Sequence, residues 1–261
     1  MTESKLFLFL SLFLLHQLAL AQISPPGMGL TKTADWFAAG LRQDLDTLSR
    51  WQSMSYAGIG RKSTPGSYNP VLKPAIAVVN QEFYHQVCKR WQYSFALSYR
   101  RQDEYRKTPP YEHSNPSIKQ EFRLYGRWSY MLQTARIRFT TTVRQEFRKF
   151  YTPDFRKPDE DFQLRSRFRI QLAVNLDTKK THRLIASSEQ LFSISREAYP
   201  AAWTDFAYHE SRFSLYYSFS PVACPFILSA GYMNNLIRHN QSYPAHYIAL
   251  DIVFINPFSS K

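Results

Sequence analysis

Arginine alternates with apolar residues along several stretches of the chain, and this spacing is the first feature that could carry chemistry. In residues 162–176, Arg165, Arg167 and Arg169 fall on one side of an extended backbone, and Phe168 and Ile170 fall on the other. Carboxylates recur at the same alternating positions of other stretches. Because guanidinium and carboxylate groups form bidentate ion pairs, the pattern predicts a charged network on one face of a sheet.

The expected network is large, and both signs of charge contribute to it. It comprises Glu82, Arg100, Glu121, Arg123, Arg127, Arg136, Arg138, Arg144, Glu146, Arg165, Arg167, Arg169, Glu189, Glu210, Arg212 and Asp251.

Catalytic and metal-binding patterns are weak by comparison. His246 and Asn234 could meet across the last predicted hairpin on its apolar side, where an outer-membrane phospholipase would keep a His–Asn pair, but no serine stands at an adjacent outward position. The histidines show no metal-ligand spacing, and no glycine loop could hold phosphate. We therefore expect no enzyme activity, no cofactor and no metal, and we keep a lipid hydrolase as an alternative.

Two cysteines, Cys88 and Cys224, both fall at short turns on the same predicted end of the sheet. An oxidising compartment would allow a disulfide between them. The two turns lie about six strands apart, however, and a disulfide needs Cα atoms within about 7 Å. Two separate thiols are the favoured state.

The net charge of +13 raises the question of nucleic acid. The arginines lie within strands on one side, whereas a nucleic-acid groove needs an exposed basic face. We expect no nucleic-acid partner. The predicted uses are pairing with carboxylates and contact of loop residues with anionic lipopolysaccharide: Arg106, Lys107, Arg156 and Lys157.

Residues 1–21 have the pattern of a signal peptide. A short charged start is followed by an apolar run over 6–15 and by Ala19-Leu20-Ala21, the small-residue pattern that signal peptidase cuts. A retained anchor is the alternative, but the apolar run is shorter than a membrane-spanning helix. We expect export, with the mature chain beginning at Gln22.

Strict alternation with a period of two continues through the mature chain and predicts strands. The eleven candidates cover residues 34–45, 51–61, 74–86, 90–104, 118–131, 134–150, 162–177, 182–196, 205–219, 224–236 and 245–255. Many exceed ten residues, which fits tilted strands that cross a hydrocarbon core. Short turns alternate with longer polar loops, the asymmetry that outer-membrane barrels show between periplasmic turns and extracellular loops.

These features together predict an all-β fold, a single antiparallel up-and-down transmembrane barrel of ten to twelve strands. Apolar residues would face lipid and the charged face would line the interior. Aromatic residues near strand ends, Trp91 and Trp128 among them, fit interfacial girdles, although ordinary β-propensity also explains them. Bacterial barrels have even strand numbers, so we expect twelve. Residues 34–258 would form the barrel, and the lead segment 22–33 would add a strand or rise through the lumen.

The chain resembles a bacterial outer-membrane β-barrel family known only as a domain of unknown function, number 2490. The resemblance spans about Asp35 to Phe254 and rests on the opening strand 35–41, the charged strands 136–148 and 162–175, the late pair 210–217 and 231–234, and the closing strand 246–251. It implies an outer-membrane location and insertion by the barrel-assembly machinery, but no activity. Barrels of this kind commonly end on an aromatic residue, whereas here Phe258 is followed by Ser259-Ser260-Lys261.

The sequence thus favours an integral outer-membrane barrel of a Gram-negative bacterium, with a structural role or a narrow arginine-lined pore. A soluble exported barrel that binds an acidic or lipidic ligand is the main alternative. The substrate, the oligomeric state and the openness of the lumen are left undetermined by these patterns.

Overall fold

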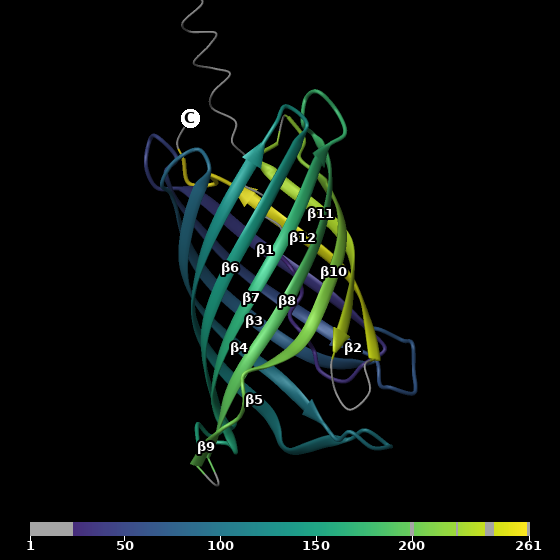
Figure 1. The fold of residues 1–261 in the computed structure, drawn as a ribbon. Coiled ribbons are helices and arrows are strands. Elements are labelled where there is room, and N and C mark those ends of the chain that lie inside the picture. The colour runs from purple at the N-terminus through teal and green to yellow at the C-terminus, as the bar shows by residue number, and fades with distance from the viewer. Residues whose placement is uncertain (1–22, 199–200, 223, 238–242, 260–261) are drawn as a thin grey trace, which may run out of the picture.

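The chain forms a closed β-barrel (Figure 1). The computed structural model describes residues 23–198, 201–222, 224–237 and 243–259. Strands but no helices occur in this part of the chain, and therefore no helix there is long and apolar enough to cross a bilayer. The predicted all-β class and the single barrel are confirmed. The predicted signal peptide, residues 1–21, lies outside the described residues.

The strands follow one another around the barrel in chain order. They are β1 (Thr33–Asp44), β2 (Trp51–Lys62), β3 (Lys73–Gln86), β4 (Trp91–Tyr105), β5 (His113–Gln133), β6 (Ile137–Tyr151), β7 (Glu160–Asn175), β8 (His182–Ala198), β9 (Ala201–Trp203), β10 (Ala207–Phe219), β11 (Phe226–Ile237) and β12 (Tyr243–Ile255).

Eleven of these strands close the wall, because β10 pairs with β8 and β12 pairs with β1. The β1–β12 pair is parallel, in the register Thr33↔His246 to Arg42↔Ile255, and every other neighbouring pair is antiparallel. Eleven lies within the predicted range of ten to twelve strands, but the preferred number of twelve and the wholly antiparallel wall were wrong. An odd number of up-and-down strands leaves the first and the last running in the same direction.

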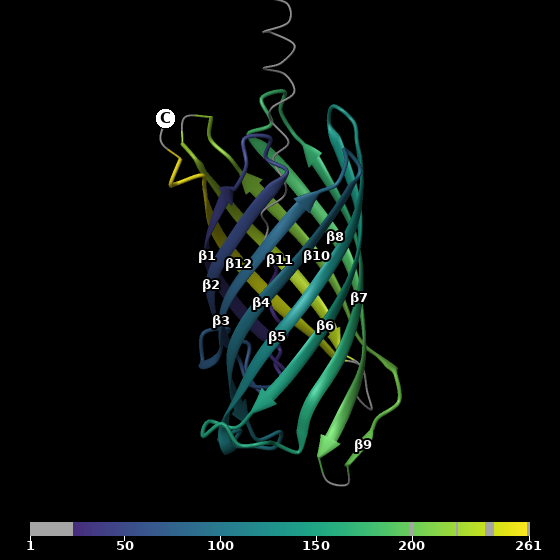
Figure 2. The same ribbon diagram turned by 90° about the vertical axis from the view of Figure 1, so that its left-hand side faces the viewer.

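The remaining strand, β9, lies outside the closed wall. It pairs only with the end of β8, where Arg196 faces Trp203. The chain then returns to the wall as β10, whose pairing with β8 begins at Ala207↔Ser193 and contains a register shift between Tyr208 and Glu210. Figure 2 shows the hairpin of β8 and β9 projecting beyond the barrel at the end that carries the longer loops.

Side chains alternate between the two faces of the wall as the period of two predicts. On β12, Tyr247, Asp251 and Val253 are fully buried inside, whereas Ile248 and Leu250 between them are exposed outside. The same alternation holds along the other wall strands, and the charged residues follow the inner positions. The apolar face therefore points outward and the arginine-rich face points inward.

The lead segment lies inside the barrel and forms no strand. Ile23 and Met28 are buried, the Met28 amide donates to the Tyr247 hydroxyl at 3.1 Å, and Lys62 Nζ donates to the Met28 carbonyl at 2.9 Å. Pro25 and Pro26 cannot donate to a ladder, which disfavours a strand here. The segment rises through the lumen to Thr33, where β1 begins at the long-loop end.

The short turns are fixed by side-chain caps. In the turn between β7 and β8, the Asp177 carboxylate accepts from the Thr181 hydroxyl at 2.7 Å and from the His182 amide at 2.9 Å. These hydrogen bonds favour the charged carboxylate and lower the pKa of Asp177 to about 2. The turn therefore keeps its cap throughout the neutral range.

Two glycines on the inner face of β2 make room for large neighbours. A Cβ added at Gly58 would stand 2.4 Å from the Trp36 ring, and one at Gly60 would stand 2.2 Å from Cε of Met28. Trp36 and Met28 are both almost completely buried. These glycines therefore allow β1 and the lead segment to pack closely against β2.

We predict that Gly58→Ala lowers the free energy of unfolding by about 1–3 kcal/mol, because Trp36 must shift within a packed interior. Gly126→Ala on β5 is the matched control, since a Cβ there would meet only the Ser94 carbonyl oxygen at 3.5 Å. Urea unfolding of the two refolded variants measures the difference. Equal stability of both would show that Trp36 is not held against Gly58.

Candidate functional site

The inner faces of β5, β6, β7, β8 and β10 carry the charged side chains into the middle of the barrel. Strand pairing places Arg127, Arg144 and Arg167 side by side, in the register Arg127↔Arg144↔Arg167. Like charges directly opposite one another on one face destabilise a sheet. Carboxylates must therefore lie close to this row.

Glu146 on β6 is the centre of this arrangement. Its carboxylate forms ion pairs with Arg144 Nε at 2.6 Å, Arg167 Nε at 2.8 Å and Arg123 Nη1 at 3.2 Å. Glu146 and Arg123 are both fully buried. One carboxylate is thus shared by three guanidinium groups from three neighbouring strands.

Other carboxylates extend the pairing to both sides. Glu121 accepts from Arg123 Nε at 2.7 Å and from Arg148 Nη2 at 2.7 Å. On the other side the pairs continue through Glu189 and Glu210. Arg167 lies 3.4 Å from Glu189, Arg212 contacts both Glu189 and Glu210, and Arg165 lies 3.9 Å from Glu210. We call this connected set the ion-pair layer.

Tyr125 joins a further pair to the layer. Glu82 on β3 forms an ion pair with Arg127 Nε at 3.1 Å, and it accepts from the Ser94 hydroxyl at 2.6 Å and the Tyr125 hydroxyl at 2.8 Å. The guanidinium of Arg144 lies 3.5 Å above the Tyr125 ring, a cation–π contact. The layer therefore reaches from β3 around to β10.

The structure brings together most of the residues predicted for the lumen. Eleven belong to the pairs just described: Glu82, Glu121, Arg123, Arg127, Arg144, Glu146, Arg165, Arg167, Glu189, Glu210 and Arg212. Arg100, Arg138 and Arg169 line a cavity beside them. Asp251 is buried on β12, away from the layer, and Arg136 lies exposed in the turn before β6.

Arg148 and Tyr125 belong to the layer although they were not predicted as site residues. Arg148 is buried, donates to both Glu121 oxygens and contacts Gln163. The signal was present, because Arg148 continues the inner parity of Arg144 and Glu146 on the same strand. A tyrosine on a charged inner face could have been recognised by the same parity.

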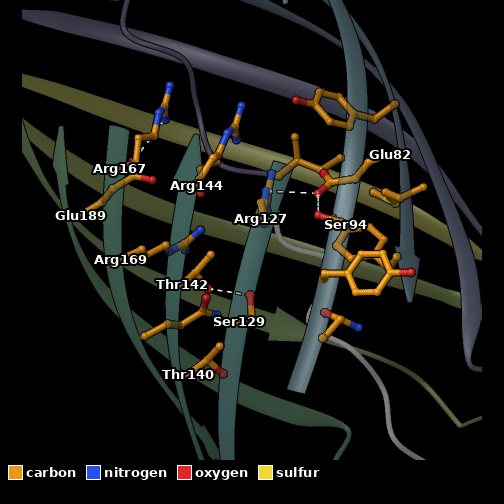
Figure 3. Close-up of a pocket in the computed structure, with 18 of the residues that line it drawn as sticks. Glu82, Ser94, Arg127, Ser129, Thr140, Thr142, Arg144, Arg167, Arg169 and Glu189 are labelled. Atoms are coloured by element: carbon orange, nitrogen blue, oxygen red, sulfur yellow. Dashed lines mark hydrogen bonds and ion pairs between the residues drawn. The ribbon is translucent and has the colours of Figure 1, made fainter. Parts of the chain in front are cut away.

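Two cavities lie on either side of the layer. One, of about 160 Å³, extends toward the short turns and is lined by eight arginines, among them Arg127, Arg144, Arg167 and Arg169 (Figure 3). The other, of about 580 Å³, extends toward the long loops. Arg100 lines both. We call them the arginine chamber and the loop-side chamber.

The comparisons with known proteins can be set against this geometry. The protein family described as "Protein of unknown function (DUF2490)" matches residues 78–246. The chain belongs to the DUF2490 family. None of the curated proteins matches it. The matched region of this DUF2490 protein runs from β3 to β12 and includes almost the whole ion-pair layer, so the described charges lie within the part that defines the family.

The residues considered for catalysis are arranged differently. His246 Nδ1 lies 3.3 Å from Asn234 Nδ2 and 2.5 Å from the Tyr232 hydroxyl on the outer face, so the expected approach of His246 and Asn234 is confirmed. The residue paired with Asn234 on β10 is Phe213, which supplies no nucleophile. The geometry of these residues supports no hydrolytic triad.

The candidate metal ligands and the two cysteines of this DUF2490 protein lie apart in the described ranges. No group of three or more His, Cys, Asp or Glu residues in those ranges could hold a metal ion. Cys88 and Cys224 are both exposed and free, as the predicted separation of their turns required.

We predict that Glu146→Gln lowers the free energy of unfolding by about 3–5 kcal/mol, because it leaves buried guanidinium groups without their shared carboxylate. Asp154→Asn is the matched control. Asp154 pairs with Arg156 in an exposed loop, where both side chains are more than half exposed, and we expect no measurable change there. Urea unfolding checks both, and an equally small effect for Glu146→Gln would contradict a network that stabilises the lumen.

Proposed function

We propose that this protein is an integral β-barrel of the outer membrane of a Gram-negative bacterium, with a lumen filled by its own lead segment and by the ion-pair layer. The observation that carries the proposal is the direction of the apolar face. Exposed large apolar residues occur on every strand of the closed wall, whereas the charged residues of the ion-pair layer lie inside. A soluble barrel would place these two sets the other way round.

The outer apolar surface is continuous around the wall. Its exposed members within the strands are Phe37, Leu41, Ile59, Val79, Trp91, Phe95, Leu97, Phe122, Leu124, Trp128, Leu132, Ile137, Val143, Phe147, Phe168, Ile170, Leu172, Leu184, Phe213, Leu215, Tyr217, Leu228, Tyr232, Leu236, Ile248, Leu250 and Phe254. Monomeric soluble proteins rarely expose contiguous apolar patches of more than a few hundred Å². Lipid is the partner whose chemistry matches a surface of this kind.

Aromatic residues lie at both edges of this surface. Near the short turns Trp91, Tyr93 and Trp128 contact one another, and near the long loops Tyr99, Phe122 and Tyr151 form a second group. On β5, Tyr130, which contacts Trp91, lies eight positions after Phe122. At ~3.3 Å per residue and a tilt of ~40°, this separation is about 20 Å along the axis. Two aromatic girdles at about this spacing are typical of outer-membrane barrels.

The few polar side chains on the outer face bond to one another. Ser166 donates to Gln145 at 2.6 Å across β6 and β7, and Gln81 donates to Ser53 at 2.8 Å across β2 and β3. Ser211 and Gln190 form a similar pair. Because an unpaired polar group in hydrocarbon costs several kcal/mol, such pairing supports burial in lipid.

The proposed partners follow from this location. Outer-membrane lipid would cover the apolar wall, and lipopolysaccharide would meet basic loop residues at the long-loop end, where the side chains of Arg156 and Lys157 are 84% and 51% exposed. The barrel-assembly machinery would act during insertion, after removal of residues 1–21. We propose no nucleic-acid partner, since much of the positive charge lies inside the wall.

We predict that Leu250→Arg, near the middle of β12 on the outer face, reduces the stability of the inserted barrel by about 2–4 kcal/mol, as arginine does at the bilayer midplane. Leu48→Arg is the matched control, because Leu48 is 68% exposed in the short turn before β2. Unfolding in lipid vesicles and the shift between boiled and unboiled samples on a gel provide the readout. If the unaltered protein stays monomeric in buffer without detergent and tolerates both changes, the barrel is soluble.

The lead segment gives a separate prediction about the lumen. The intact protein should show no resolved steps in planar bilayers, because the lead and the ion-pair layer fill the barrel together. Deletion of residues 22–32 should produce small steps that favour anions, since arginine-lined pores select for them. Only samples that keep the gel shift of a folded barrel are compared. Equal conductance of both proteins would exclude the lead segment as a plug.

A further inference from the structure

The arginine chamber has a large excess of positive charge. Among the described residues, its lining contains eight arginines, Arg42, Arg100, Arg127, Arg138, Arg144, Arg167, Arg169 and Arg212, and two carboxylates, Glu82 and Glu189. The lining therefore carries a formal charge of 8 − 2 = +6. When Glu146 and Glu210, which pair with the chamber arginines Arg144 and Arg212, are added to the count, the formal charge is still 8 − 4 = +4.

The loop-side chamber provides an internal comparison. Its lining contains the cations Arg100, Lys119, Arg148 and Arg165 and the anions Glu104, Glu121, Glu160, Asp205 and Glu210, so it is close to neutral. The excess is therefore a property of one half of the lumen and not of the barrel in general. Charges held away from bulk water require counter-charges nearby.

Buried donors without acceptors also line the arginine chamber. Among the described residues, neither Arg100 Nε nor Gln171 Nε2 has a hydrogen-bond partner. Hydroxyl groups surround the same space, including those of Thr140, Thr142 and Ser129, which come from β5 and β6. Buried donors of this kind normally have a partner. An acceptor of negative charge would satisfy both the charge excess and the open donors.

The positions of the side chains suit a small ligand. Figure 3 shows Arg127, Arg144, Arg167 and Arg169 projecting from neighbouring strands into one space, with the Thr142 hydroxyl beside them. The cavity of about 160 Å³ is smaller than the ~300 Å³ or more of sites for drug-sized molecules. Its lining reaches Gln92 and Arg138, the second residues of β4 and β6, and thus the short-turn end.

We propose that the arginine chamber binds a small oxyanion, with phosphate as the best match, that enters along the barrel axis from the short-turn end. Guanidinium and hydroxyl donors form charge-assisted hydrogen bonds with phosphate oxygens. A lipid headgroup is not the expected source, because hydrogen-bonded strands close the wall all around. The site requires a closed barrel wall, but it does not require that lipid rather than water surrounds the wall. The anion-binding proposal is therefore independent of the proposed membrane location.

Two variants test the site at arginines that line the chamber. Arg100→Gln removes a charge that lines the chamber, and Arg169→Gln removes one whose Nη2 donates to Ser187 at 3.2 Å. Arg136→Gln, in the exposed turn at the same end, is the matched control. Thr142→Val removes a hydroxyl donor without changing the charge. All four proteins are first checked for the gel shift of a folded barrel.

The measurement is equilibrium dialysis of the purified mature chain in phosphate-free detergent against radiolabelled phosphate, with chloride or acetate as competitor at equal ionic strength. We expect saturable uptake of about one phosphate per barrel, about tenfold weaker in Arg100→Gln and Arg169→Gln, as for the loss of one charge-assisted hydrogen bond, and unchanged in Arg136→Gln. Competition by acetate but not by chloride would support a general oxyanion site.

Uptake that does not saturate, or that falls equally in Arg136→Gln, would overturn the proposal and leave only nonspecific attraction by the basic barrel. Greater stability of Arg100→Gln than of the unaltered protein in every salt, without loss of phosphate uptake, would also overturn it. That result would mean that the chamber arginines repel one another with no bound anion.

Discussion

The structure depends on the alternation of side chains across a wall that is one strand thick. In a strand, the side chains before and after an outward-facing residue point inward. The positions of the outer leucines and phenylalanines therefore fix which residues face the interior. In this protein the inner positions carry arginine and glutamate. The wall cannot present its apolar face to lipid without enclosing these charges, and the ion-pair layer is the consequence.

The cost of enclosing the charges explains the form of the layer. Removing an ion from water costs several kcal/mol, and an isolated pair seldom recovers that amount. Sharing reduces the cost, since Glu146 serves three guanidinium groups and Glu121 serves two. Arginine suits this role because its planar fork can pair with two carboxylates at once, as Arg123 does with Glu121 and Glu146. The layer thus holds five neighbouring strands together from within.

The lead segment explains both the odd number of strands and the parallel pair. A chain that began with a wall strand at the short-turn end would close an even barrel in which all pairs are antiparallel. Here residues 23–32 use the lumen for the first ascent, so β1 begins at the long-loop end, as β12 does. Pro25-Pro26 was the signal in the sequence, since two consecutive residues without an amide hydrogen cannot join a ladder. The glycines of β2 then provide the space that Met28 needs.

The strands were predictable because alternation over more than ten residues is a strong local signal. Residues 51–61 were predicted and β2 covers Trp51–Lys62, while residues 162–177 correspond to β7, Glu160–Asn175. The ends of the strands were predicted less precisely. Arg136 was therefore assigned to the inner face of a strand, although it precedes β6 by one residue. The ion-pair partners were beyond sequence analysis. They depend on the register between strands and on the depth to which long side chains reach, neither of which is encoded by the spacing within one strand.

The same geometry changes the meaning of the basic composition. A net charge of +13 suggests a basic surface, but the lining of the arginine chamber alone accounts for a formal +6. Charge inside a closed wall is available to small solutes that travel along the axis and not to a polymer that docks on the outside. Neutralisation by carboxylates is nearly complete toward the long loops and incomplete toward the short turns. The barrel therefore has electrically different ends, and any solute that reaches its interior from the short-turn side meets the positive half first.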